Sequence, residues 1–180
     1  MRPTIIVGLI TSLLVTSMPA AGAAAPILDP SIASFEGSYI DLRDGWGDAT
    51  ACASDGLTTQ CFRTELELDR FLGSGSVEDV AQALIGFVIQ SVCSASLKLY
   101  SNTSYGGSVL ALTTRFTFLN LSTWAFSNVT SSYKVGACSA TFYDGASGGA
   151  PVYPGPTFAW ASATSMLAGW DNRISSVYIS

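Results

Sequence analysis

Two stretches of the chain, residues 126–135 and 170–179, hold the side chains with the clearest chemistry. Each runs from an aromatic residue through two small residues with side-chain oxygens, then two spacers, to a Ser-Ser pair. Hydroxyl, amide and carboxylate oxygens gathered on a tight turn are the ligands that a hard cation such as Ca²⁺ prefers. The same residues are also ordinary turn formers, because their side chains hydrogen-bond to their own backbone in bends. From the residues alone, both interpretations stay open.

The two stretches are copies of one another, 44 positions apart. Residues 93–95 (Cys-Ser-Ala) are likewise echoed by residues 138–140, and each copy then carries a tyrosine, Tyr100 and Tyr143. A repeat of this period predicts one supersecondary unit used twice, in which neither copy can bury its apolar face alone.

Catalytic chemistry has little support in the sequence. The chain contains no histidine, which excludes His-ligated zinc and His-based acid–base catalysis. Residues 145–149 match the G-x-S-x-G nucleophile elbow, but that motif needs a strand-to-helix turn and a histidine base, whereas the flanks here predict a hairpin loop. The net charge of −5, without a cluster of Lys and Arg, leaves no footprint for nucleic acid. We therefore expect neither an enzyme nor a nucleic-acid-binding protein.

The first residues read as a targeting segment. Arg2 precedes an apolar stretch over residues 5–18, and residues 21–23 (Ala-Gly-Ala) form a small-x-small cleavage site. This pattern predicts a signal peptide over residues 1–23 and a secreted protein. The apolar stretch is shorter than the roughly 20 residues of a membrane-spanning helix, so we expect no membrane association.

Four cysteines follow the predicted leader: Cys52, Cys61, Cys93 and Cys138. In an oxidising compartment such a set predicts two disulfides, for which three pairings are possible. We favour Cys52–Cys61 with Cys93–Cys138, because each bridge then stays within one region of the chain. The absence of a CxxC spacing argues against a cysteine-based metal site.

Charge divides the rest of the chain. Nearly all acidic residues lie between positions 24 and 92, whereas residues 93–180 hold more basic than acidic side chains. This asymmetry predicts a boundary near Cys93, with an acidic N-terminal extension over 24–92 and a second domain over 93–180. The two copies within that domain span residues 93–136 and 137–180.

The elements that must position the repeated stretches can be placed coarsely. Residues 26–60 look irregular or extended, with one short strand near 38–42. Thr64 and Glu67 form a capping box that predicts a helix ending before Gly73, and a second helix is expected over 77–91. After Cys93 apolar and polar residues alternate, which predicts half-buried strands.

These residues carry a resemblance to a known family. Tyr100-x4-Tyr105-x-Gly107 resembles the folded-hairpin signature of the βγ-crystallin Greek key, and residues 171–176 (Asp-Asn-Arg-Ile-Ser-Ser) resemble its calcium motif. The resemblance covers about residues 93–180. The whole chain also resembles small secreted actinobacterial proteins with an acidic segment before such a domain. It implies a mainly β fold, in which two Greek keys form a sandwich after a small extension with one or two helices.

The family resemblance also implies a calcium site between the two copies. Its ligands would be the hydroxyls of Ser131 and Ser175, with the remaining oxygens from Val129, Arg173, Asn128, Asp171, Asn172, Ser101 and Asp144. We expect Ser132 and Ser176 to be structural and to bond the hairpins. The domain has only two carboxylates, so binding should be weak, with a dissociation constant of about 10⁻⁴ M or larger. Arg173 weakens it further if its side chain turns inward.

Two residues depart from the family pattern: Ser127 replaces an expected Asn or Asp, and Gly148 replaces an expected aromatic residue. The function implied is a secreted, monomeric, non-enzymatic module with a structural or binding role and weak calcium binding. The alternative is a secreted interaction protein of the crystallin-fold metalloproteinase-inhibitor type. That alternative would present the Gly- and Pro-rich loop 145–156 to a protein partner, because binding residues sit on loops held by a rigid scaffold.

Overall fold

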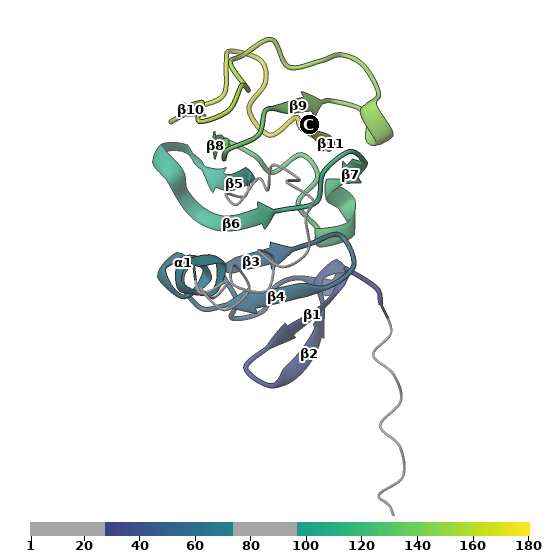
Figure 1. Ribbon diagram of the computed structural model, residues 1–180, viewed down its shortest axis with the longest axis vertical. Coiled ribbons are helices and arrows are strands. Elements are labelled where there is room, and N and C mark those ends of the chain that lie inside the picture. The colour runs from purple at the N-terminus through teal and green to yellow at the C-terminus, as the bar shows by residue number, and fades with distance from the viewer. Residues whose placement is uncertain (1–27, 74–96) are drawn as a thin grey trace, which may run out of the picture.

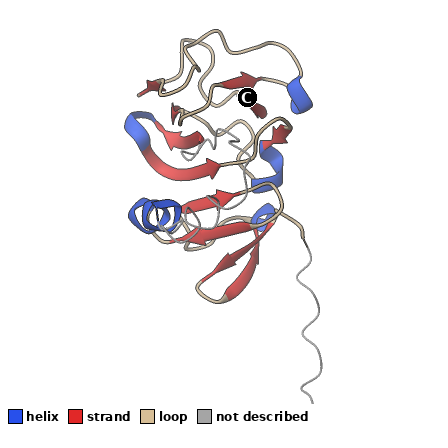
Figure 2. Ribbon diagram, in the orientation of Figure 1, coloured by secondary structure: helices blue, strands red, loops and turns tan. Residues whose placement is uncertain are grey.

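The computed structural model describes residues 28–73 and 97–180. The predicted leader, the predicted helix over 77–91 and Cys93 lie outside the described residues. The described part is built mainly from strands, with one α-helix and several short 3₁₀ turns (Figures 1 and 2). No helix within these two ranges is long and apolar enough to cross a membrane.

The strands form two sheets, one of eight strands and one of three. The first sheet has the order β10-β8-β5-β6-β3-β4-β1-β2, and the second has the order β7-β11-β9. Their bounds are β1 (Ile32–Phe35), β2 (Ser38–Asp41), β3 (Ala51–Ser54), β4 (Thr59–Phe62), β5 (Leu97–Asn102), β6 (Gly106–Leu112), β7 (Phe118–Asn120), β8 (Ser132–Lys134), β9 (Ala140–Tyr143), β10 (Ser162–Ala163) and β11 (Ser176–Ile179). The helix is α1 (Glu65–Gly73).

The two repeats exchange strands. The first copy supplies β5, β6 and β8 to the large sheet, but its third strand β7 pairs with β11 of the second copy. In return, β10 of the second copy pairs with β8 of the first. Each repeat therefore completes the sheet of the other, as two Greek keys closing on one another require. The predicted fold class, a mainly β sandwich of two Greek keys, is confirmed.

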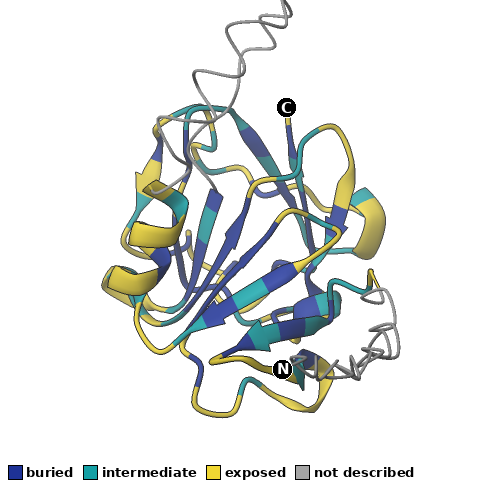
Figure 3. Cartoon of the chain, turned by 60° about the horizontal axis from the view of Figure 1, so that its bottom comes forward, coloured by how far each residue is buried: buried dark blue, intermediate teal, exposed yellow. Residues whose placement is uncertain are grey.

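A shared core holds the two copies together. Tyr133 of β8 and Phe142 of β9 meet edge to face with their ring centroids 4.9 Å apart, and Tyr153 lies 5.9 Å from both. Trp170 extends this aromatic cluster, 5.3 Å from Tyr153. Aromatic side chains bury large apolar areas, so a cluster drawn from both repeats ties the copies to one another. Figure 3 shows the buried positions gathered along the strands, while α1 turns a largely exposed face outward.

The acidic segment joins the same sheet and core. Strand β3 runs parallel to β6, with Ala51 opposite Val109 and Ser54 opposite Leu112. Residues 28–62 thus form four strands, where the sequence predicted one; that one, near 38–42, is present as β2. The extra strands escaped prediction because they are short and rich in Ala, Ser, Thr and Cys, which gives weak apolar alternation.

Tryptophans fasten the acidic segment to the first repeat. The Trp124 indole N–H donates to Thr59 Oγ1 at 3.1 Å, and the Trp46 indole N–H donates to the Trp124 carbonyl at 2.8 Å. The Trp46 ring also stacks on Phe126 with centroids 5.5 Å apart. The buried Trp124 and the partly buried Trp46 therefore each have a partner for the indole N–H, as tryptophans in a core usually need.

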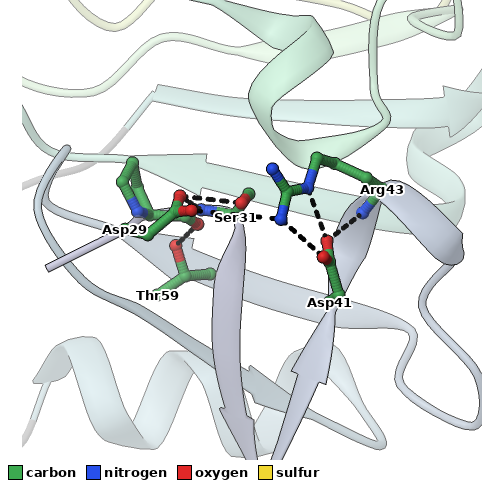
Figure 4. A network of polar contacts seen from close by, with 6 residues as sticks. Asp29, Ser31, Asp41, Arg43 and Thr59 are labelled. Atoms are coloured by element: carbon green, nitrogen blue, oxygen red, sulfur yellow. Dashed lines mark hydrogen bonds and ion pairs between the residues drawn. The ribbon is translucent and has the colours of Figure 1, made fainter. Parts of the chain in front are cut away.

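A polar network fixes the beginning of β1 beside the end of β2 (Figure 4). The Asp29 carboxylate accepts from the Ser31 amide and hydroxyl, and these hydrogen bonds lower the pKa of Asp29. The Arg43 guanidinium donates to both oxygens of Asp41, which lowers the pKa of Asp41. Thr59 Oγ1 donates to the Pro30 carbonyl at 2.5 Å. Arg43 is exposed and the two aspartates are partly exposed, so the network orients the chain more than it stabilises it.

The disulfide between Cys52 and Cys61 links β3 to β4, with an S–S distance of 1.98 Å. This confirms one of the two favoured pairings. None of the described cysteines is free. The pairing of Cys138 with Cys93 stays a prediction.

Helix α1 begins with the predicted capping box: the Glu67 amide donates to Thr64 Oγ1 at 3.3 Å, and the Thr64 amide donates to Glu67 Oε2 at 3.0 Å. Leu68 is fully buried against β3, β5 and β6. On the same side, Lys98 donates to Glu65 at 2.8 Å and to Asp69, and the Tyr100 hydroxyl donates to Glu65 at 2.7 Å. Polar and apolar contacts therefore dock the helix together.

The carboxyl of Glu65 should make stability depend on pH. Burial raises its pKa, but the hydrogen bonds from Lys98 and Tyr100 outweigh burial and leave the pKa below its ordinary value of 4.5. A lowered folded-state pKa stabilises the fold above pH 4.5, and this contribution is lost as the pH falls through the folded pKa. We predict that Glu65→Gln costs about 1 kcal/mol at pH 7 and progressively less below pH 4.

Urea denaturation of both proteins between pH 3 and pH 7 measures this difference. Asp44→Asn, at an exposed position outside the helix contact, is the control and should change stability little at any pH in that range. A Glu65→Gln cost that is independent of pH would contradict the prediction.

Candidate functional site

The two repeated loops, residues 127–131 and 171–175, lie against one another in equivalent positions. The Asn128 amide donates to the Ile174 carbonyl at 2.8 Å, and the Asn172 amide donates to the Thr130 carbonyl at 3.0 Å. Asn128 and Asn172 both have left-handed backbones, with φ of 59° and 53°. Asn tolerates this region better than most residues, which explains why it stands at the same position of both loops.

Side chains cross between the loops in the same way. The Ser131 hydroxyl donates to Asn172 Oδ1 at 3.3 Å, and the Ser175 hydroxyl donates to Asn128 Oδ1 at 3.0 Å. We refer to these contacts as the Ser131 pair (Ser131 with Asn172) and the Ser175 pair (Ser175 with Asn128). The structure thus brings together four predicted ligands as two hydroxyl–amide pairs, each drawn from both repeats.

Two more predicted ligands are backbone carbonyls in these loops. Those of Val129 and Arg173 accept no hydrogen bond from any residue that the structure describes. Val129 is half-buried and Arg173 is exposed. These two oxygens are therefore open to a ligand as far as residues 28–73 and 97–180 are concerned, as a role in binding would require.

The second serine of each pair latches a hairpin. The Ser132 hydroxyl donates to the Asn102 carbonyl at 2.6 Å and accepts from the Tyr105 amide at 3.1 Å. The Ser176 hydroxyl donates to the Gly145 carbonyl at 2.7 Å and accepts from the Gly148 amide at 3.0 Å. Both serines are fully buried. These contacts are the ones that the expected structural role requires.

The predicted ligands Ser101 and Asp144, in the two hairpins, already have partners within the protein. Ser101 Oγ accepts from the Ser108 amide at 2.8 Å within its own hairpin. Asp144 is engaged by Arg173, whose Nε lies 2.8 Å from Asp144 Oδ2. The Arg173 guanidinium also donates to the Gly169 carbonyl at 3.2 Å and lies over the Trp170 ring. Arg173 has therefore turned toward the site and occupies its hairpin carboxylate.

The two pairs differ in charge as a result. Asp144 lies beside the Ser175 pair, since the Ser175 amide donates to the Tyr143 carbonyl, and its charge is already compensated by Arg173. Asp171 precedes Asn172 of the Ser131 pair, is exposed, and forms no ion pair with a described residue. No three Asp, Glu, Cys or His side chains gather into a metal-binding cluster in residues 28–73 and 97–180. The donors fit a weakly bound calcium at the Ser131 pair better than at the Ser175 pair.

A neighbour supplies the aromatic ring missing from the second hairpin. In the first copy, Tyr100 and Tyr105 pack with their ring centroids 5.5 Å apart. In the second, the Phe118 ring lies 5.7 Å from Tyr143, and a Cβ on Gly148 would come within 2.4 Å of that ring. Phe118 belongs to β7, which the first copy lends to the second sheet. Sequence comparison within one hairpin could not find it, because the replacement comes from another part of the chain.

Thr130 is a feature that sequence reasoning passed over. It is fully buried, and its hydroxyl has no hydrogen-bond partner among the described residues. The equivalent residue of the other loop is Ile174, also fully buried. A buried hydroxyl without a partner costs free energy that an apolar group of the same shape does not.

We predict that Thr130→Val raises the free energy of unfolding by about 1 kcal/mol, because it removes the unpaired hydroxyl and keeps the side-chain volume. Chemical denaturation measures the change. A destabilised Thr130→Val protein would show that the hydroxyl has a partner in solution.

The two serines of the second motif should respond differently to truncation. Ser176→Ala leaves the partly buried Gly145 carbonyl and Gly148 amide without the partners that the buried serine gave them, so we predict a loss of about 2 kcal/mol. Ser175→Ala breaks one bond at a partly exposed site and should cost less than half as much. The same denaturation measurement compares them, and equal costs would contradict the assignment of distinct roles.

The chain is similar to solved βγ-crystallin domains. A βγ-crystallin from Ciona intestinalis is 21% identical with a TM-score of 0.41, and the match covers 48% of this chain and 100% of that one. A domain from Flavobacterium johnsoniae is 18% identical with a TM-score of 0.39, covering 47% of this chain and 92% of that one. A clostrillin double mutant in complex with nickel is 17% identical with a TM-score of 0.35, covering 47% and 95%.

The similarity extends over about half of the chain and concerns the fold. No family model matches the sequence, and no curated protein sequence matches it either. The predicted resemblance to βγ-crystallin domains is confirmed as a similarity of fold over that half of the chain.

Proposed function

We propose that the protein is a secreted, non-enzymatic βγ-crystallin-like module with a structural or binding role, and that it binds calcium weakly between its two repeated loops. One observation carries the proposal: the Ser131 and Ser175 pairs place hydroxyl and amide oxygens from both repeats within hydrogen-bond distance of each other. A cation that is coordinated by oxygens of both loops would hold the repeats together. The leader-like start of the sequence and the disulfide between Cys52 and Cys61 support secretion.

The charges of the site limit the affinity. Calcium affinity rises with the number of charged ligands, and here the hydroxyls, amides and carbonyls are neutral. Asp171 contributes the carboxylate that is free of an ion pair with the described residues, while Arg173 compensates Asp144. We therefore assign the stronger binding to the Ser131 pair, with a dissociation constant of about 10⁻⁴ M or larger.

The alternative, a protease inhibitor presenting residues 145–156, has less support. The Gly145 amide donates to the Gly149 carbonyl at 2.8 Å, which closes the start of this loop on itself. Tyr153 is buried, and the Tyr133 hydroxyl donates to the Pro156 carbonyl at 2.7 Å. Most of the loop is therefore tied to the domain, and Val152 is its one large exposed apolar side chain. Ser147 lies in the 3₁₀ turn Ala146–Gly148 of this loop, with its amide bound to Asn120.

Calcium should stabilise the protein measurably. With a dissociation constant of about 10⁻⁴ M, 10 mM calcium adds about 2.7 kcal/mol to the free energy of unfolding. We predict that the melting temperature, measured by calorimetry, is higher in 10 mM calcium than in EDTA. We expect no such rise in 10 mM magnesium, because magnesium demands stricter coordination geometry.

Two matched carboxylate variants locate the effect. Asp171→Asn should reduce the calcium-dependent rise, whereas Asp144→Asn should leave most of it in place. A wild-type melting temperature that calcium does not change would remove calcium binding from the proposal.

Arg173 offers the opposite test. Arg173→Gln removes the cation beside Asp144 and frees a carboxylate next to the Ser175 pair. We predict a severalfold gain in calcium affinity, measured by isothermal titration, together with a small loss of stability without calcium. Arg63→Gln, which breaks a surface ion pair with Glu36 in the acidic segment, is the control and should leave calcium affinity unchanged. An Arg173→Gln protein with weaker calcium binding would refute this role for the guanidinium.

A further inference from the structure

A groove of about 610 Å³ lies away from the repeated loops. Lys98 of β5, Lys134 of β8 and Ser162 of β10 follow one another across neighbouring strands of the large sheet, and Leu72 at the end of α1 and Trp160 also line the groove. These elements all lie on the left side of the molecule as drawn in Figure 1. The volume falls within the range of small-molecule sites, which are mostly apolar with a few convergent polar groups.

Trp160 gives this groove an exposed aromatic side chain on a well-held backbone. Its side chain is 70% exposed, whereas Trp124 and Trp170 are buried. Its backbone has φ of 66°, a conformation that is costly for a bulky residue. The backbone is nevertheless held on both sides, because the Trp160 amide donates to the Gly136 carbonyl at 2.8 Å and the Val135 amide donates to the Ala161 carbonyl at 2.7 Å. The exposed indole is therefore carried by a backbone that hydrogen bonds hold in place. A large apolar ring kept at the surface in this way suits a ligand-binding role.

The polar groups that line or adjoin the groove include both hydrogen-bond donors and acceptors. Lys98 donates to Glu65 and Asp69, and these bonds outweigh burial and raise the pKa of Lys98. The Lys134 ammonium lies 4.4 Å from the centroid of Tyr105 and 5.3 Å from that of Tyr100, and makes no ion pair with a described residue. Two ammonium groups and two carboxylates thus balance one another, although the protein as a whole carries a net charge of −5.

We propose that this groove binds an uncharged oligosaccharide. A sugar ring has an apolar C–H face that can stack on an exposed indole, and a rim of hydroxyls that both donate and accept hydrogen bonds. The groove offers the indole of Trp160, the ammonium groups of Lys98 and Lys134, the carboxylate of Asp69 and the hydroxyl of Ser162. Because its local charges cancel, the groove has no long-range attraction for an anion or a cation. A neutral sugar ring with many hydroxyls therefore suits both the indole and the charge-balanced polar groups of the groove.

This proposal is independent of calcium binding, because the groove contains no residue of the loops 127–131 and 171–175. The direct test is tryptophan fluorescence of the full chain during titration with neutral hexasaccharides of glucose, mannose and N-acetylglucosamine. We expect at least one of them to give a saturable change, with the same dissociation constant in EDTA as in calcium. No saturable response to any of the three would overturn the proposal.

Variants at position 160 separate binding from folding. Trp160→Gly removes the ring and relieves the left-handed backbone, so it should fold at least as stably and bind at least tenfold more weakly. Calorimetry of binding is needed for this variant, since the reporting indole is gone. Phe158→Ala is the matched control, because Phe158 is also exposed, lies two residues away and does not line the groove. Unchanged binding in Trp160→Gly, or equal losses in both variants, would overturn the assignment.

The occupant can be checked in the same experiments. Binding of heparin, a sulfated chain, with an affinity that falls as salt rises while the neutral sugars stay inert would show an anion site and refute the proposal. Acrylamide quenching of tryptophan fluorescence in the free protein, compared between wild type and Trp160→Phe, measures how accessible the Trp160 indole is. An indole that is protected from acrylamide would show that another part of the chain fills the groove, and would also refute the proposal.

Discussion

The exchange of one strand between the two repeats is the constraint on which this structure depends. With β7 paired to β11 and β10 paired to β8, neither Greek key has a complete sheet without the other. The same exchange brings the loops 127–131 and 171–175 face to face, where their backbones bond reciprocally through Asn128 and Asn172. The candidate site is therefore a consequence of how the copies close, and any change that separates the sheets also dismantles the site.

The copies have diverged where their charges matter. Both loops use an Asn in the left-handed region and a serine that reaches across to it, so the backbone and the hydroxyl–amide pairs are nearly symmetric. Arg173 breaks this symmetry, because its counterpart in the first loop is Val129 and its guanidinium takes Asp144. The protein thereby supplies a positive charge of its own at one pair. Crossed hydrogen bonds hold the two loops together without an added cation, whereas the ion pair ties the second loop to the hairpin of its own repeat.

The sequence predicted features whose determinants are local. The capping box of Thr64 and Glu67, the hairpin latched by Ser132 and the pairing of Cys52 with Cys61 each depend on residues within one turn or one hairpin, or on neighbouring strands. Features decided by distant contacts were out of reach. Phe118 fills the space above Gly148 from another repeat, and the direction of the Arg173 side chain depends on Asp144, which lies 29 residues earlier. Short strands such as β3 have little apolar pattern of their own and form because β6 lies beside them.

The acidic segment is tied to this fold by contacts that do not involve the repeated loops 127–131 and 171–175. Its strands lengthen the first sheet through β3 and β6, and Thr59 and Trp46 bind the first repeat through Trp124. Its helix α1 is then held along β5 by Leu68 and by the contacts of Glu65 and Asp69 with Lys98. Without α1, the groove beside Lys134 and Trp160 would lose the lining that Leu72 and Asp69 provide. The segment therefore contributes Leu72 and Asp69 to a groove that Lys134 and Trp160 also line, and so adds a surface that the two repeats could not form alone.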